Sequence, residues 1–155
     1  MIQKTSISAI RGLVFLAKLD PVRLFSPRKL AEAIDESPTY MAKISRLLVK
    51  AGILRSHKGS KGGVEISRSP EQISLLEIVE ACQGTIVGDY CSVVCDPDDT
   101  CAYHQAAAEL RQAIIFVLSR WNLAQLVARP APRLPLETSV TCVLQGSLPM
   151  SHLRH

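Results

Sequence analysis

The chain has 155 residues, which suits one domain or a small domain with an appendage, and 47% of them are hydrophobic, enough to form a core. Its formal net charge of +4 is unevenly distributed: residues 1–70 hold thirteen Lys/Arg against five Asp/Glu, whereas residues 71–155 hold five against nine. There is no apolar run near the roughly 18 residues of a membrane span and no signal-peptide pattern at the start, so we expect a cytoplasmic protein without membrane contact.

Three helices are predicted in the basic half. Residues 5–17 place apolar side chains at helical spacing after a cap at Thr5 or Ser6. The stretches FSPRKLAEAID and SPTYMAKISRLLVKAG both carry a Ser-Pro pair, in which the serine (Ser26 or Ser37) caps the helix and the proline opens it. Because only a few residues separate the second helix from the third, the two predict a helix-turn-helix.

A two-stranded hairpin is predicted next. Residues 53–56 and 64–67 can each form a short strand, and the stretch HKGSKGG between them supplies the glycines that a tight hairpin needs. Lys58 and Lys61 would then lie at the tip of a projecting ribbon. Three helices followed by such a ribbon are the plan of a winged helix-turn-helix, so residues 1–84 are predicted to form a DNA-binding domain of this kind.

The second half is predicted to contain a short helix and a long one. Ser74 and Glu77 have capping-box spacing at the start of the short helix. The stretch HQAAAELRQAIIFVLSRWNLAQLV predicts one continuous helix over residues 105–127, with a heptad-like apolar seam that a domain this small cannot cover. A second copy of the chain is expected to cover it. The seam residues are Leu110, Ile114, Val117 and Trp121, widened by Ile115, Leu118 and Leu126.

The fold class is therefore mainly α with a small β-hairpin wing: a winged helix-turn-helix plus a long C-terminal dimerisation helix. Residues 128–155 contain several prolines and show no periodicity, which is typical of a flexible tail.

Part of the third helix is a candidate DNA-binding surface, because an α-helix fits the major groove and its N-terminal residues reach the base edges. Four of its residues lie off the apolar stripe and are candidate contacts: Thr39, Tyr40, Lys43 and Arg46. We expect Arg46 to meet phosphate. Tyr40 could equally be half-buried.

Further cations are candidates outside that helix. Lys58 and Lys61 at the ribbon tip could enter a narrow minor groove or bind phosphate, and Arg11, Arg28 and Lys29 could add phosphate contacts. Each cation alone is somewhat better explained as an ordinary solvated side chain than as a DNA contact. The order of the elements and the charge of the first half together favour DNA binding.

The stretch CSVVCDPDDTCAYH gathers Cys91, Cys95, Cys101 and His104 within fourteen residues. Five cysteines are an odd number, and clustered cysteines in a reducing compartment are more often metal ligands or redox-active thiols than structural disulfides. Thiolates favour iron–sulfur clusters, zinc or copper(I). Three cysteines and a histidine suit tetrahedral zinc, whereas the five-residue gap between Cys95 and Cys101 suits a cluster better.

The stretch SPTYMAKISRLLVKAGILRSHKGSKGGVEISRSPEQISLLEIVEACQG resembles the bacterial Rrf-type winged-helix transcriptional regulators (IscR/NsrR/CymR-like family). The resemblance extends to about residue 127 and implies a homodimer with crossing long helices that binds a palindromic operator. It implies DNA contacts at Ser37, Thr39, Tyr40, Lys43 and Lys58. Two departures concern the wing: Lys58 stands where the family has an arginine, and Lys61 and Val64 replace a common glycine and aromatic residue.

The same resemblance implies an iron–sulfur cluster, of the [2Fe–2S] type, on Cys91, Cys95, Cys101 and His104. Relatives of the IscR kind carry C-x5-C-x5-C-x2-H here, and this chain keeps the last two intervals but shortens the first to three residues. Cys82 is a possible replacement ligand, although it lies on an apolar helix face where buried free cysteine is common. Relatives with a [4Fe–4S] cluster use a carboxylate near residue 8, where this chain has a serine.

These observations predict a dimeric DNA-binding transcriptional regulator that senses iron, redox state or nitric oxide through a cluster in a cysteine-rich loop, residues 85–104. An alternative keeps the DNA binding but makes the site a structural zinc or a thiol switch. A third hypothesis, a small redox protein or electron carrier, lacks the C-x-x-C of thioredoxin-like proteins, a βαβ unit and a nucleotide loop. We expect no enzymatic activity.

Overall fold

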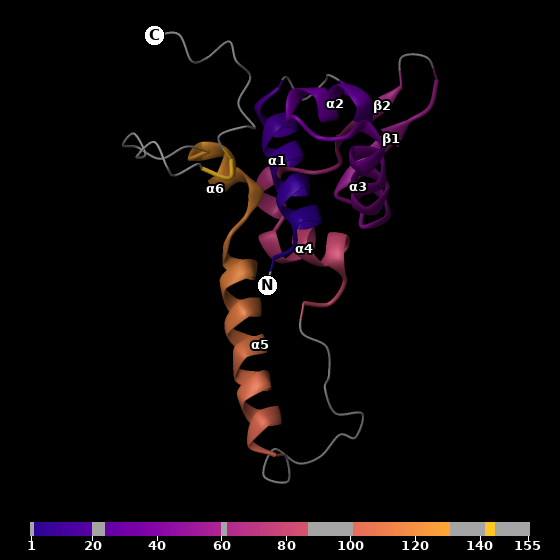
Figure 1. Ribbon diagram of the computed structural model, residues 1–155. Coiled ribbons are helices and arrows are strands. Elements are labelled where there is room, and N and C mark those ends of the chain that lie inside the picture. Colours follow the sequence, from indigo (N-terminus) through magenta and orange to yellow (C-terminus); the bar gives the residue numbers. More distant parts are fainter. Residues whose placement is uncertain (1, 20–23, 60–61, 87–100, 131–141, 145–155) are drawn as a thin grey trace.

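The computed structural model describes residues 2–19, 24–59, 62–86, 101–130 and 142–144 (Figure 1). Within these residues it contains helices and one antiparallel hairpin, as the fold-class prediction requires, and none of the helices is long and apolar enough to cross a membrane. The elements in chain order are α1 (Lys4–Lys18), α2 (Pro27–Ala33), α3 (Pro38–Lys50), β1 (Leu54–His57), β2 (Gly63–Ile66), the 3-10 turn η1 (Pro70–Gln72), α4 (Leu75–Gln83), α5 (Ala102–Arg120) and α6 (Leu123–Ala128).

Of the four helix caps predicted from the sequence, two form the expected side-chain hydrogen bonds and two do not. Ser26 accepts a hydrogen bond from the N–H of Lys29, and Ser74 forms a complete capping box with Glu77. Ser37 occupies the N-cap position of α3 without a side-chain cap. The predicted cap at Thr5 or Ser6 is wrong: α1 begins at Lys4, because the hydroxyls of Thr5 and Ser6 take part in contacts with other helices.

The core is built around α1, which contacts α3, α4 and α6 and the strand β2. Its middle turns are buried, and the rings of Phe15 and Phe25 pack edge to face with centroids 5.5 Å apart. The fully buried large side chains come from α1, α2, α3, α4 and α6 and from the segments beside them: Leu13, Val14, Leu30, Ile34, Met41, Ile44, Ile53, Ile73, Ile78, Val79 and Leu123.

The wing is held at its base by a third segment. The two strands pair from Leu54 opposite Ile66 to His57 opposite Gly63, so the first lies one residue later, and the second one residue earlier, than predicted. Val64 also exchanges two backbone hydrogen bonds with Phe25, at 2.8 and 3.1 Å. A Cβ on Gly63 would lie 2.7 Å from the Phe25 carbonyl oxygen, so only glycine allows this close approach.

The predicted continuous helix over 105–127 is wrong in two respects. The observed helix α5 begins at Ala102, so His104 lies in a helix and not in a loop. Helix α5 ends at Arg120, and a separate helix, α6, starts at Leu123. The break is made by long-range backbone bonds: Leu75 donates its N–H to the Trp121 carbonyl at 2.8 Å, and Leu123 donates to the Ile73 carbonyl at 2.9 Å. Asn122 then caps α6 together with Gln125.

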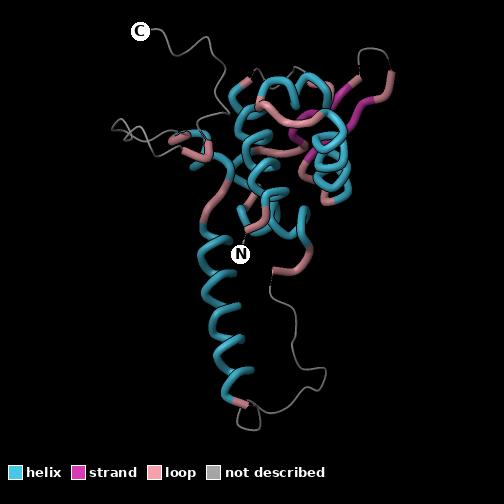
Figure 2. The backbone as a smooth tube through the Cα atoms, in the orientation of Figure 1, coloured by secondary structure: helices cyan, strands magenta, loops and turns pink. Residues whose placement is uncertain are grey.

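Helix α5 extends away from the compact part of the molecule (Figures 1 and 2). Its predicted seam is largely exposed to solvent: Leu110 is 58% exposed, Val117 51% and Trp121 44%, and the neighbouring Phe116 is 61% exposed. Leu118 is the buried residue of this helix. After α6, Leu144 packs against the core, while residues 131–141 and 145–155 of the predicted tail lie outside the described residues.

Candidate nucleic-acid interface and thiol site

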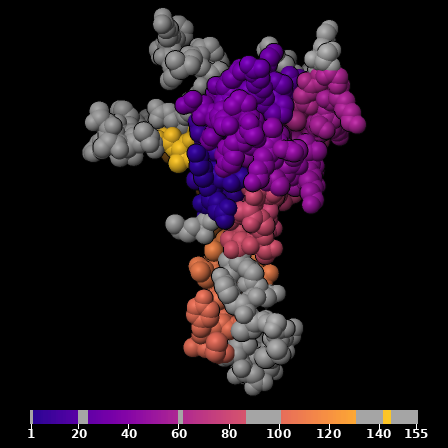
Figure 3. Space-filling model, turned by 45° about the vertical axis from the view of Figure 1, so that its right-hand side comes forward, coloured from indigo at the N-terminus to yellow at the C-terminus, as the bar shows by residue number. Residues whose placement is uncertain are grey.

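The exposed face of α3 carries most of the predicted DNA contacts. Ser37, Thr39, Lys43 and Arg46 are exposed, whereas Met41, Ile44 and Leu48 of the same helix are buried. The division between apolar and polar faces that the sequence predicts for this helix is therefore present. Figure 3 shows the hairpin at the edge of the compact part of the molecule, beside the surface of α2 and α3.

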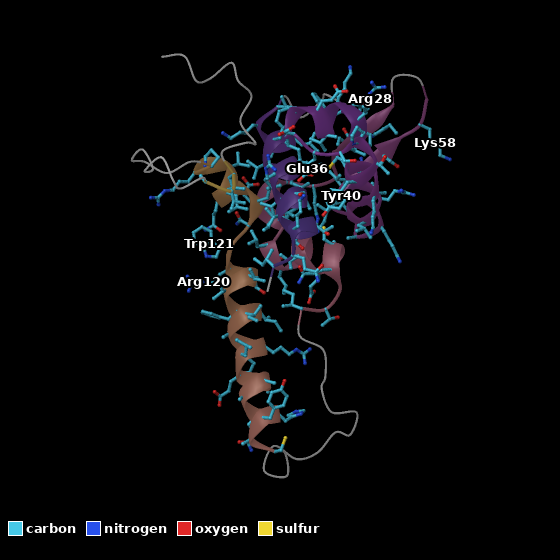
Figure 4. All side chains as sticks on the ribbon, in the orientation of Figure 1. Arg28, Glu36, Tyr40, Lys58, Arg120 and Trp121 are labelled. Carbon is cyan, nitrogen blue, oxygen red and sulfur yellow. The ribbon has the colours of Figure 1, made fainter. Side chains whose placement is uncertain are left out.

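Tyr40 is arranged differently from its neighbours. It is half-buried, and its hydroxyl donates to Oγ1 of Thr5 on α1 at 3.0 Å. The Lys4 ammonium lies 5.9 Å from the centre of the Tyr40 ring, at cation–π range. In Figure 4 Tyr40 lies among the helices, between α1 and α3. The hydroxyl hydrogen that a phosphate contact would use is thus engaged inside the protein.

The wing presents a mixture of charges. Lys58 is exposed at the end of β1, as predicted, and Lys61 lies outside the described residues. Behind Lys58, the Glu65 carboxylate is 2.7 Å from Nε2 of His57 and 4.0 Å from a guanidinium nitrogen of Arg55. This carboxylate offsets positive charge on the strands, whereas Lys58 is exposed beyond the end of β1.

The additional cations fall into two classes. Arg28 and Lys29 are exposed on α2, with Arg28 in an i,i+4 pair with Glu32 at 3.2 Å. Arg11 points inward: one guanidinium nitrogen donates to the Ile34 carbonyl at 2.6 Å, and another lies 3.8 Å from the Glu36 carboxylate. The suggested phosphate contact of Arg11 therefore finds no support in its position.

The described part of the cysteine segment places two predicted ligands on one helix turn. Cys101 is exposed at the N-cap of α5, and His104 follows in the first turn. Residues three apart on a helix lie on one face, so thiolate and imidazole can approach one ion together. Nδ1 of His104 is buried and has no hydrogen-bond partner among the described groups.

The other two predicted ligands, Cys91 and Cys95, lie outside the described residues. Within the described ranges, no three His, Cys, Asp or Glu side chains come together as a metal site. The donor types of Cys101 and His104, a soft thiolate and an imidazole, fit both an iron–sulfur cluster and zinc.

Cys82 and Cys142 lie apart from this turn. Cys82 packs against the core from α4, and burial raises the pKa of its thiol to about 11. A thiol that stays protonated at neutral pH is a poor ligand and a poor nucleophile, so its position agrees with a structural role. Cys142 is partly buried and its thiol lies 3.9 Å from the Pro130 carbonyl.

Two polar contacts of α1, one to the turn between α2 and α3 and one to α4, were missed from the sequence. The Ser8 hydroxyl, 1% exposed, donates to the Glu36 carboxylate at 2.6 Å, and the Ser6 hydroxyl donates to Gln83 at 2.9 Å. Two serines on an otherwise apolar helix face were the available signal, because buried hydroxyls almost always have partners. The partners themselves lie 28 and 77 residues away in sequence, so spacing could not identify them.

Comparison with known proteins agrees with this arrangement. Residues 2–129 match the sequence model of the Rrf2 family, described as an iron-dependent transcriptional regulator. The fold is similar to that of CymR, the global cysteine regulator of B. subtilis, with a TM-score of 0.66 and 23% identity over 83% of this chain and 96% of that one. It is also similar to IscR of T. potens, with a TM-score of 0.65 and 20% identity over 83% of this chain and 86% of that one.

A third similar structure is the oxidized form of S. aureus CymR, with a TM-score of 0.66 and 23% identity over 85% of this chain and 99% of that one. At these identities the likeness concerns the fold. The winged helix-turn-helix predicted from the sequence is confirmed, and so is the family resemblance.

Proposed function

Because this chain belongs to the Rrf2 family of transcriptional regulators, which are not enzymes, we propose that it binds an operator as a homodimer and that an iron–sulfur cluster in its cysteine segment controls this binding. The observation that carries the DNA-binding part is the exposed polar face at the start of α3 beside a basic wing. The cluster part depends on the Cys101–His104 turn.

DNA binding is supported by the position of the cations. Thr39 and Lys43 are exposed on the first turns of α3, where a helix in the major groove meets base edges. Arg46 lies further along the same helix and Lys58 on the wing, at places suited to phosphate. We propose that Ser37 and Lys61 add further contacts and that the operator is palindromic, as a symmetric dimer requires.

Homodimer formation is supported by the apolar surface of α5. Leu110, Phe116 and Val117 are each more than half exposed on one helix, and an exposed apolar patch on a helix is typical of an interface. A second copy offers the same surface, so the two can cover each other around a twofold axis.

A cluster bound by Cys91, Cys95, Cys101 and His104 would supply a group whose presence and charge depend on iron, oxidants or nitric oxide. Of these residues, Cys101 is exposed at the start of α5, and His104 lies one turn later with an Nδ1 that has no hydrogen-bond partner among the described groups. Both lie on the helix proposed to hold the two subunits together. Changes in their ligation would therefore act on the spacing of the two DNA-binding units.

The experiment is anaerobic purification of the full chain with assays of iron, sulfide and zinc and a visible spectrum. We expect iron and sulfide with a coloured protein, loss of both in Cys101→Ala, and retention in the matched variants Cys82→Ala and Cys142→Ala. Zinc alone would favour the alternative with a structural zinc site. A protein that contains neither iron nor zinc, but whose DNA binding changes on oxidation, would favour the thiol switch. The likeness to the oxidized form of S. aureus CymR is a reason to test this alternative.

DNA binding is tested separately, with a duplex that the chain selects from a randomised library. A steep fall of affinity with salt is expected, because each neutralised phosphate releases counterions. A chain that selects no duplex in either the metal-loaded or the metal-free form would contradict the proposal.

A further inference from the structure

The turn between α2 and α3 is attached to α1 by charged and polar side chains. Arg11 of α1 donates to the Ile34 carbonyl at 2.6 Å on one side of Asp35, and its guanidinium lies 3.8 Å from the Glu36 carboxylate on the other side. The same carboxylate accepts the Ser8 hydroxyl at 2.6 Å. The guanidinium thus straddles Asp35, whose φ of 54° is in the left-handed region that non-glycine residues rarely adopt.

A second attachment lies four residues further on. The Tyr40 hydroxyl donates to Oγ1 of Thr5 at 3.0 Å, one turn of α1 before Ser8. Glu36 and Tyr40 are therefore two fixed points on the helix-turn-helix, and both are fixed to the same face of the same helix. Figure 4 shows these two side chains lying between the helices, while Lys58 projects from the wing.

The residues between the two fixed points include two of the proposed DNA contacts, Ser37 and Thr39. Ser37, Pro38 and Thr39 are all exposed, whereas Glu36 before them and Tyr40 after them are partly buried. Base recognition needs donors and acceptors held to within a fraction of an ångström. A segment anchored on both sides meets that need better than one anchored by its helix alone.

From this geometry we infer that Thr5, Ser8, Arg11, Glu36 and Tyr40 form a clamp that positions Ser37 and Thr39 for base recognition. In this clamp Tyr40 and Arg11 are positioning residues that act through the α3 start and not by touching DNA. The inference rests on the proposed DNA binding and replaces the sequence-based expectation for Tyr40 as a contact. It adds Glu36, Ser8 and Thr5 as residues on which operator specificity depends.

A positioning residue and a contact residue differ in measurable ways. Loss of a phosphate contact weakens binding to every sequence alike and lowers the salt slope by about 0.9 per contact. Loss of positioning weakens binding to the selected sequence more than to a scrambled one, and it leaves the salt slope unchanged. Simple loss of stability lowers the fraction of folded protein, so it raises the apparent dissociation constants of both duplexes by the same factor.

The test measures fluorescence anisotropy of two labelled duplexes over a series of KCl concentrations, one selected by the wild-type chain from a randomised library and one of scrambled sequence. The variants Tyr40→Phe and Thr5→Val each remove one hydroxyl group, and Glu36→Gln removes one negative charge. All three change the side-chain volume very little. Thr5→Ser keeps the hydroxyl and is the matched control. Lys43→Met serves as the contact-type comparison.

We expect Tyr40→Phe, Thr5→Val and Glu36→Gln each to weaken binding to the selected duplex by roughly fivefold or more, the worth of about one hydrogen bond. Binding to the scrambled duplex and the salt slope should be unchanged for Tyr40→Phe and Thr5→Val, and Thr5→Ser should match the wild type. Glu36→Gln also removes a negative charge near the phosphates, so it should bind the scrambled duplex as tightly as the wild type or more tightly. The double variant Thr5→Val/Tyr40→Phe should be no weaker than either single variant, because the two side chains share one bond.

Two results would overturn the inference. One is a Tyr40→Phe chain that loses affinity for both duplexes with a lower salt slope, which would make Tyr40 a contact. The other is a Thr5→Val chain that binds both duplexes as the wild type does. Amide hydrogen exchange gives a readout without DNA: exchange at residues 36–41 should be faster in Tyr40→Phe than in the wild type. If the wild type selects no duplex but this exchange difference is present, the proposed function fails and the clamp does not.

Discussion

Ser74 and Asn122 pair in an isolated antiparallel bridge, and each is also the N-cap of a helix, α4 and α6 respectively. The two capping boxes begin at the same place, with buried Ile73 and Leu123 beside them. Helix α5 ends directly before this bridge, so its direction is set by the backbone bonds of Trp121 and Leu123 to the start of α4. The exposed side of α5 is thereby presented at a fixed orientation.

Replacing Val117 by Asp should separate the proposed dimer. The side chain is 51% exposed on the α5 seam, and placing a charge in an apolar interface costs several kcal/mol unless it is paired. Light scattering coupled to size-exclusion chromatography should give the mass of a single chain for Val117→Asp. Gln112 is an exposed polar residue of the same helix, so the control variant Gln112→Glu should keep the mass of the wild type. A wild-type chain that is itself monomeric would contradict the proposed dimer.

Replacing Glu77 by Gln should reduce stability at neutral pH but not in acid. Burial alone would raise the pKa of Glu77, but hydrogen bonds from Arg68 and Ser74, with the Arg68 charge, hold it below the usual 4.5. A carboxyl with a lowered folded-state pKa stabilises the fold above its unfolded pKa and loses this contribution as the pH falls through and below 4.5.

Because Glu77 is 42% exposed, solvent screening limits the difference between wild type and Glu77→Gln at pH 7 to about 1 kcal/mol or less. Urea unfolding at pH 7 and in mild acid measures it, and the difference should shrink in acid. Glu32→Gln breaks a pair whose side chains are 81% and 60% exposed, so it should change stability very little at either pH. A difference for Glu77→Gln that grows as the pH falls would contradict the assignment.

Cys82 should resist alkylation in the folded, metal-free chain. Its pKa of about 11 leaves little thiolate at neutral pH, and thiolate is the reactive form. Mass spectrometry after iodoacetamide treatment should find exposed Cys101 modified first and Cys82 much later. In urea the two rates should become similar; rapid labelling of Cys82 in the folded chain would mean that α4 opens readily.

Two glycine substitutions should have opposite effects. A Cβ on Gly12 would meet Leu30 at 3.6 Å and Met41 at 3.8 Å, ordinary contact distances, so Gly12→Ala should stabilise α1 by about 0.5–1 kcal/mol. A Cβ on Gly63 would lie 2.7 Å from the Phe25 carbonyl, so Gly63→Ala should destabilise by about 1–3 kcal/mol. Urea midpoints with unchanged m-values would measure both, and equal effects would refute the packing argument.

The elements that the sequence predicted well are those specified by neighbouring residues. The Ser26–Pro27 start of α2 and the capping box of Ser74 with Glu77 are local signals, and both are present. The hairpin followed from its glycines and lies within one residue of its predicted bounds. The exposed polar face of α3 followed from helical periodicity.

The features that the sequence did not reveal depend on distant partners. The break between α5 and α6 requires the start of α4, and the apolar pattern runs through Trp121 without a sign of it. The signal present was the capping pair of Asn122 and Gln125, which the continuous periodicity concealed. Tyr40 was predicted to face either way, because its inward bond depends on Thr5, 35 residues earlier.

The bonds between Phe25 and Val64 separate two kinds of position in the hairpin. At its root, a substitution disturbs packing that extends to the centre of the molecule. Beyond the root, the exposed side chain of Lys58 can change without disturbing that packing. The glycines beside it cannot, because Gly59 has a φ of 109° and a Cβ on Gly62 would collide with the His57 carbonyl oxygen. Natural variation, or an engineer wishing to retarget the protein, would therefore find the side chain at position 58 a less costly place to make changes than the root of the ribbon or its glycines.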